Sequence, residues 1–218
     1  MRRALPVARG SPGAGIEPAP GDASGGDIFG KRKRKALRRR AAFPVALSRP
    51  AVPAIPLGMQ PVRLTPDDDM QAIHRLLSTA FAYMEDRIDP PSSLRRMTPS
   101  TFAEEARRKE LWALLDPAPV ACMVLTPRPG HLYLGKLAVA EDQRGRGIAR
   151  LMLAHADARA RALGLPALVL QTRVELTENH AAFTRLGFAE TGRTAHAGYD
   201  RPTSVTFTRT VAQPEPAP

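Results

Sequence analysis

Hydrophobic and polar positions alternate along the chain in a way that predicts a single α/β domain over residues 59–211. Apolar residues recur at helical spacing over 70–81, 98–109 and 148–162. Short apolar runs between these stretches have strand character, at 62–64, 111–115, 120–125, 132–139, 168–170, 188–191 and 205–211. A strand, a crossover helix and a strand form a right-handed unit, so 132–139 and 168–170 should pair in parallel. The pattern therefore predicts a mixed sheet of about six to seven strands.

The helix boundaries and buried faces follow from capping residues and apolar spacing. Thr65 is expected to cap the first helix, with Pro66 at its first position and Asp67 to Asp69 near the positive end of its dipole. Its predicted buried face contains Met70, Ile73, Leu76, Leu77, Ala80 and Phe81. Thr98 or Pro99 should begin a second helix that turns Phe102 and Ala106 inward, and the helix after Gly147 should bury Ile148, Leu151, Met152, His155 or Ala158, and Ala162.

Charge is concentrated in an N-terminal extension. Of the net charge of +11 over 218 residues, +9 lies in residues 1–58, and the remaining chain carries 20 basic and 18 acidic residues. This extension is rich in Pro, Gly, Ala and Arg, so we expect it, and the tail 212–218, to be disordered. Its basic run 31–40 suits either a patch for nucleic acid or a solvated leader. We favour the leader, one form of which is translation beginning at Met59, and expect no nucleic-acid partner.

Composition also bears on compartment, membrane and metal. No run of about 18 apolar residues exists, so no membrane partner is expected. The single cysteine, Cys122, lies in an apolar run and predicts a buried thiol in a cytoplasmic protein. One cysteine and five scattered histidines offer no zinc spacing, so we predict no metal.

The segment from Leu137 to Ala149 is a strand that ends in a basic glycine loop and opens a helix. The first turn of a helix has free backbone N–H groups and a positive dipole end, and Arg144 and Arg146 add charge. Such a turn suits a pyrophosphate. A Walker loop would need Gly-Lys-Ser/Thr, and a dinucleotide fingerprint would need Gly or Ala where Arg150 stands. Neither pattern is present, and an ordinary tight turn is the remaining alternative.

The loop Gln143-Arg-Gly-Arg-Gly-Ile-Ala149 resembles the Gln/Arg-x-x-Gly-x-Gly/Ala loop of the GCN5-related N-acetyltransferase (GNAT) family. The segment Glu178 to Phe188, which ends in Leu-Gly-Phe, resembles that family's second block. By itself the second block also fits a helix that ends at a C′ glycine, Gly187. Together the two blocks imply the GNAT fold, with a mixed α/β sheet and helices on both faces, and acetyl-CoA as cosubstrate.

The resemblance also implies which residues hold acetyl-CoA. Backbone groups of the strand before the loop would pair with pantetheine and face the thioester oxygen. Asn179 would hydrogen-bond CoA, although a helix N-cap role fits it as well. The implied cosubstrate-binding residues are Leu137, Ala138, Val139, Gln143, Arg144, Gly145, Arg146, Gly147, Ile148, Ala149 and Asn179.

In the resembled family an amine attacks the thioester directly, without an acyl-enzyme intermediate. Many members place a tyrosine five residues before the Phe of Leu-Gly-Phe, to protonate the leaving thiolate. Here that position holds Phe183. Tyr199, His180 and Glu175 are the alternative candidates for proton transfer. Each also has an ordinary structural interpretation, as a loop anchor, a surface histidine or a helix-dipole partner.

We therefore predict a cytoplasmic N-acetyltransferase that moves an acetyl group from acetyl-CoA to an amine of a small molecule, peptide or protein. In the resembled family the region of residues 87–109 lines the acceptor pocket. Glu85, Asp86 and Asp89, in or next to this region, hint at a cationic acceptor, although a solvated helix end explains them too. Two alternatives stay open, namely a CoA-binding sensor without turnover and a nucleic-acid-associated protein that uses the basic arm. The oligomeric state is open as well, with a homodimer among the options.

Overall fold

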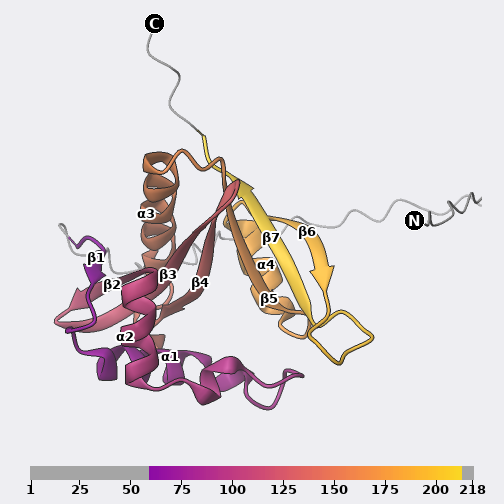
Figure 1. Cartoon of the computed structure of the whole chain (residues 1–218), viewed down its shortest axis with the longest axis horizontal. Helices are drawn as coiled ribbons and strands as arrows, with labels where there is room; N and C mark the ends of the chain where they lie inside the picture. Colours follow the sequence, from indigo (N-terminus) through magenta and orange to yellow (C-terminus); the bar gives the residue numbers. More distant parts are fainter. Residues whose placement is uncertain (1–58, 213–218) are drawn as a thin grey trace, which may run out of the picture. The chain divides into compact units, whose positions relative to one another are not determined.

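A seven-stranded sheet forms the framework of the computed structural model, which describes residues 59–212 (Figure 1). The strand order is β1-β2-β3-β4-β5-β7-β6. Only β4 and β5 pair in parallel, and all other neighbours are antiparallel. This arrangement confirms the predicted mixed sheet and its parallel pair. The strands are β1 (Val62–Leu64), β2 (Glu110–Asp116), β3 (Ala118–Arg128), β4 (His131–Val139), β5 (Ala167–Arg173), β6 (Ala189–Thr194) and β7 (Ser204–Thr210).

Helices cover both faces of the sheet, as predicted. On one face α1 (Met70–Phe81) and α2 (Pro99–Arg108) pack over a cluster that includes Phe102 and Leu111. On the other face α3 (Ile148–Ala162) packs over a cluster around Met152, and side chains of α4 (Thr177–Arg185) extend it. Alternate residues of β3 enter the two clusters, which makes β3 a buried strand at the centre. Three short 3₁₀ turns complete the elements, at Ala82–Met84 (η1), Ser93–Arg96 (η2) and Glu141–Gln143 (η3).

The start of α1 differs from the prediction. Asp69, not Thr65, is the N-cap, and its carboxylate accepts a hydrogen bond of 2.9 Å from the N–H of Ala72. Thr65 instead forms a turn in which Asp68 accepts bonds from its N–H and its hydroxyl. Local bonding within this turn holds residues 65–69 outside the helix. The predicted apolar face of α1 is otherwise confirmed, since only Phe81 of that set is not fully buried.

The buried stripe of α3 is rotated relative to the prediction. Ile148 and Met152 are buried as expected, but Ala158 and Ala162 are exposed. The helix turns Leu153, Ala156 and Ala160 inward instead. Alanine occurs on all sides of this helix, so apolar spacing alone does not determine which alanines meet the sheet.

Residues 1–58 and 213–218 lie outside the described residues, as do the predictions made for them. Among residues 59–212, no helix has the length and apolar character needed to cross a bilayer. The second helix agrees with its prediction, since Thr98 caps α2 and Phe102 and Ala106 point inward.

Replacing Asp69 with alanine should lower the free energy of unfolding by about 1 kcal/mol, because the N–H of Ala72 loses its acceptor. The midpoint of thermal unfolding should fall by about 2–4 °C. Asp67→Ala is the matched control, because Asp67 is exposed and accepts no hydrogen bond within the described part of the chain. Calorimetry that gives equal shifts for both variants would contradict the assignment of the cap.

Candidate active site

The parallel strands β4 and β5 separate soon after they begin to pair. Only Leu132 and Tyr133 have partners on β5, namely Leu168 and Val169. Beyond this point the side of β4 that faces β5 has no strand partner, and Figure 1 shows the two strands diverging. The backbone groups of the residues from Gly135 to Val139 on this side are therefore open to a ligand.

A β-bulge accompanies the separation. On β3, Cys122 pairs with Ala138 and Val124 pairs with Gly135, so two β4 residues lie opposite Met123 alone. One of the two, Lys136, has a left-handed backbone with φ of 51°. The bulge bends β4 away from β5 while its pairing with β3 continues on either side. The segment predicted to meet the thioester thus lies on a bent strand with one free side.

The predicted anion loop follows β4 directly. Gly145 and Gly147 have φ of 76° and 86°, a region that favours glycine, and Gly147 caps α3 without any side-chain hydrogen bond. Within residues 59–212, no hydrogen bond uses the backbone N–H groups of Gly147, Ile148 or Ala149. These groups and the dipole of the 15-residue helix face the exposed loop. The loop has the geometry of an anion site.

Side chains of the loop divide into two groups. Arg144 is exposed and lies against the end of α1, where it donates to the backbone oxygen of Ala80 at 3.4 Å. Arg146 donates to the side chain of Gln143 and is half-buried. Arg144 and Gln143 border the groove described next, whereas Arg146 is held within the loop by its hydrogen bond to Gln143.

Three hollows of similar size run in series from this loop. The loop hollow has a volume of about 410 Å³ and includes Gly145, Gly147 and Ala149. It shares Val139, Arg144, Ala149 and Leu186 with a middle hollow of about 430 Å³. The middle hollow shares Phe81, Tyr83, Leu137, Asn179 and Phe183 with a far cavity of about 400 Å³. One continuous groove therefore follows the free side of β4 from the anion loop to the far cavity.

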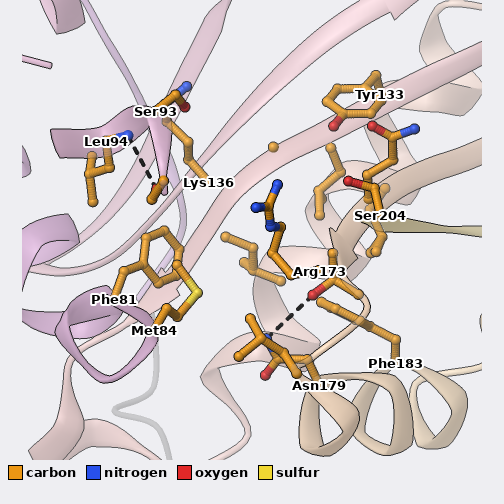
Figure 2. A pocket seen from close by; sticks show the side chains of 18 of the residues that line it. Phe81, Met84, Ser93, Leu94, Tyr133, Lys136, Arg173, Asn179, Phe183 and Ser204 are labelled. Atoms are coloured by element: carbon orange, nitrogen blue, oxygen red, sulfur yellow. Dashed lines mark hydrogen bonds between the residues drawn. The ribbon is translucent and has the colours of Figure 1, made fainter. Parts of the chain in front are cut away.

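The junction of the middle hollow and the far cavity contains Tyr83, Asn179 and Phe183. Asn179 is not the N-cap of α4, which is Leu176, so the capping interpretation is wrong. Its side-chain Nδ2 donates to the Tyr83 hydroxyl at 3.0 Å and to the Thr172 hydroxyl at 3.5 Å. Figure 2 shows Asn179 beside Phe183 at this junction. Phe183 packs against Phe188 and Phe207 and presents no proton donor.

The acetyltransferase (GNAT) family model matches residues 70–188, more than half of the chain. The chain belongs to the GNAT acetyltransferase family. No curated protein matches it significantly. The resemblance noted in the sequence is thereby confirmed, and the seven-stranded sheet is the GNAT fold.

Solved structures of other GNAT proteins share this fold at low identity. The ribosomal-protein-S18-alanine N-acetyltransferase of Escherichia coli is 20% identical with a TM-score of 0.51, and the match covers 72% of this chain and 96% of that chain. A GNAT acetyltransferase of Elizabethkingia anophelis with acetyl-CoA bound is 18% identical, with a TM-score of 0.50 and coverage of 70% and 97%. The PaiA N-acetyltransferase of Thermoplasma acidophilum in complex with coenzyme A is 11% identical, with a TM-score of 0.59 and coverage of 71% and 99%.

The three candidates for proton transfer all lie outside the lining of the far cavity and the middle hollow. Nε2 of His180 is 2.8 Å from the backbone oxygen of Arg173, and the imidazole packs against Phe207. The Tyr199 hydroxyl donates to Asp89, which raises the pKa of Tyr199. An oxygen of Glu175 accepts a hydrogen bond of 3.4 Å from the N–H of Asp89. In this structure the three side chains fasten the loops around the cavity.

The acidic residues that hinted at a cationic acceptor also do not line the far cavity. Glu85 is paired with Arg95 at 3.4 Å, and Asp89 is paired with Arg201 at 2.9 Å. Their charges are balanced at the surface, which supports the solvated interpretation.

Several polar residues of the far cavity were not predicted as site residues, namely Tyr83, Tyr133, Lys136, Arg173 and His196. They come from η1, β4, β5 and the loop before β7. For Lys136 the sequence offered one indication, because this residue directly precedes Leu137 to Val139, the segment predicted to face the thioester oxygen. The others carry no motif, and the fold alone brings them together. Within residues 59–212, no group of three or more His, Cys, Asp or Glu side chains is arranged to hold a metal.

Cys122 lies under the bulge as the predicted buried thiol, and its S–H donates to the backbone oxygen of Lys136 at 3.8 Å. Burial raises the pKa of Cys122 to about 12.

The native thiol of Cys122 should therefore resist a thiol-reactive disulfide at pH 8 and react at once after unfolding. Because unfolding restores the ordinary pKa, the thiol's contribution to stability should be complete below about pH 8.5 and should disappear as pH rises toward 12. Rapid native labelling at pH 8 would contradict the placement of Cys122.

Proposed function

We propose that the protein is an N-acetyltransferase that moves the acetyl group of acetyl-CoA to an amine by direct attack in a ternary complex. The observation that carries the proposal is the continuous groove from the α3 loop, along the free side of β4, to the far cavity. A groove with an anion site at one end and a separate cavity at the other suits two substrates bound together. The GNAT structures with acetyl-CoA or coenzyme A bound support the assignment of the cosubstrate.

The residues fit the parts of acetyl-CoA in order. The free amides of Gly147, Ile148 and Ala149, with Arg144 beside them, would bind the diphosphate. Pantetheine would lie along the free side of β4 in the middle hollow, whose lining is mostly apolar, and hydrogen-bond to the open backbone groups. The acetyl group would then reach the junction at Leu137 and Asn179. There a backbone N–H of β4 would stabilise the charge that develops on the thioester oxygen.

Tyr83 is the group best placed to protonate the leaving thiolate. It lines both the middle hollow and the far cavity, on the same junction as Phe183, which occupies the position of the tyrosine of other members. The hydrogen bond from Asn179 fixes its hydroxyl there. A tyrosine from η1 would thus replace one from α4.

Binding of acetyl-CoA provides the first test. Gly145→Val should raise the Kd measured by isothermal titration about 10-fold or more, because a branched side chain is strained at φ of 76° and projects from the loop that lines the groove. Gly164→Val is the matched control, because Gly164 has φ of 65°, is equally open, and lies at the end of α3 outside the three hollows. Equal loss of affinity in both variants would show that backbone strain alone acts, and unchanged affinity in Gly145→Val would refute the loop as the anchor.

Proton transfer provides the second test. Tyr83→Phe should lower kcat about 10- to 100-fold, which is at or below the lower limit of general-acid effects because a thiolate is already a fair leaving group. The Kd of acetyl-CoA should stay nearly unchanged. Tyr199→Phe removes a hydroxyl bound to Asp89 outside the cavity and should retain kcat. Steady-state kinetics over an amine panel supplies the measurement. A loss in Tyr199→Phe with full activity in Tyr83→Phe would reverse the assignment.

The same panel separates an enzyme from a sensor that binds CoA without turnover. The sensor alternative draws on Phe183, which cannot donate a proton. Tight acetyl-CoA binding with no acetylation of any amine, and with only slow thioester hydrolysis, would favour it.

A further inference from the structure

We infer that the acceptor amine is a small molecule with an anionic group, a carboxylate or a phosphate, and that Arg173 binds this group. The inference rests on the proposed function, because it concerns the second substrate of the same site. It starts from the charges on the wall of the far cavity. Among the described residues, the charged side chains that line it are those of Lys136 and Arg173, and none of them is a carboxylate.

The two cations differ in their partners. Nζ of Lys136 is 3.0 Å from Glu105 of α2, which also binds Lys109 at 2.7 Å. Burial opposes ionisation of Glu105, yet the hydrogen bonds from both lysines keep its pKa below its ordinary value. Lys136 is therefore matched by a carboxylate and directed toward α2.

The hydrogen-bond partners of Arg173 are neutral. Its guanidinium donates to the backbone oxygen of Pro90 and to the imidazole of His196. Within residues 59–212, no carboxylate lies within 4 Å of it. The nearby Asp89 and Glu175 favour the charge of Arg173 from a distance, but they lie 2.9 and 3.9 Å from Arg201 and outside the cavity lining. Arg173 is thus a cation without a direct counter-ion on the described wall.

Partial burial of the Arg173 guanidinium favours the binding of an anion. Arg173 is half-buried, its Nε atom is buried without a hydrogen-bond partner, and burial lowers its pKa. A guanidinium nevertheless stays charged at neutral pH, so desolvation without a counter-ion is costly unless a ligand supplies one. Figure 2 shows the side chain extending from β5 into the middle of the cavity, between Lys136 and Ser204. The planar fork of arginine matches a carboxylate or a phosphate.

The size and position of the cavity fit a small acceptor. A volume of about 400 Å³ is in the usual range for small-molecule sites. Leu137, where the thioester would lie, and Arg173 line the same cavity. One small ligand can therefore present its amine to the thioester at Leu137 and its anionic group to Arg173. A polyamine would instead place positive charge against Arg173. The wall therefore selects for acceptors with a negative group and against polycations.

The test compares matched pairs of acceptors. L-α-Amino acids are paired with their carboxamides, O-phosphoethanolamine is paired with ethanolamine, and spermidine represents polycations. The neutral member of each pair cannot form the charge-assisted hydrogen bond with Arg173. We therefore expect kcat/KM to be about 10- to 100-fold higher for the anionic member of at least one pair. The pair that shows the preference distinguishes a carboxylate from a phosphate. Equal rates within every pair, or spermidine as the best acceptor, would overturn the inference.

Variants locate the origin of the preference. Arg173→Gln should reduce the preference to within about 3-fold by lowering kcat/KM for the anionic member only. Arg201→Gln removes the same charge from the neighbouring cluster but not from the cavity wall, and should keep the preference. Equal losses in both variants would assign the effect to the general field and overturn direct binding. Arg173→Lys, which keeps the charge without the fork, replaces Arg173→Gln if the latter does not fold by circular dichroism.

Calorimetry separates failure of this inference from failure of the proposed function. The same amino acids and O-phosphoethanolamine are titrated into the complex of the protein with CoA. Binding of an anionic probe that is lost in Arg173→Gln would support the inference even if no amine is acetylated. Acetylation of neutral amines, with no anionic probe bound or preferred, would refute the inference and leave the acetyltransferase intact.

Discussion

The separation of β4 from β5 is the constraint on which the rest of the site depends. A parallel pair normally continues its ladder, but here it stops after two residue pairs. The extra residue at Lys136 bends β4 and is held in a left-handed backbone, which costs about 1–2 kcal/mol for a residue with a Cβ. Two contacts hold it there, the ion pair to Glu105 and the thiol bond from Cys122 to its carbonyl. Packing on the α1 and α2 face thus keeps open the groove that we propose binds acetyl-CoA.

Positive charge lies at both ends of the groove and comes from different groups at each end. At one end the helix dipole and Arg144 act together, and the anion is met mainly by backbone groups. At the other end Arg173 meets the cavity with its side chain, fixed by neutral contacts from Pro90 and His196. Between them the middle hollow is bordered largely by apolar side chains such as Ala138, Val139 and Ala182. A cosubstrate with a charged head and a neutral arm matches the first part, and an anionic acceptor would complete the second.

The sequence predicted the parts of this site that are local in the chain. The loop from Gln143 to Ala149 could be recognised because strand, glycines and helix follow one another within a few residues. The same holds for Leu-Gly-Phe at the end of α4. Arg173 and Tyr83 could not be found in this way, because they are about 90 residues apart and line one cavity only in the folded chain. The cap at Asp69 and the rotated stripe of α3 were missed because several neighbours were chemically equivalent. The local turn of Thr65 and Asp68 decides the first, and packing on the sheet decides the second.

Phe183 stands where many members of the family carry a tyrosine, and its packing shows what the position does in this chain. Its ring lies 6.1 Å from Phe188 and 5.9 Å from Phe207 between ring centroids, so it belongs to the apolar contact that joins α4 to the sheet. The Tyr83 hydroxyl on the same junction is the one that we propose acts in its place. Asn179 connects the two arrangements, because it comes from α4 and binds the Tyr83 hydroxyl from η1. If the hydroxyl of η1 serves the thiolate, α4 contributes by positioning it, and the chemistry depends on how η1 and α4 are held together across the groove.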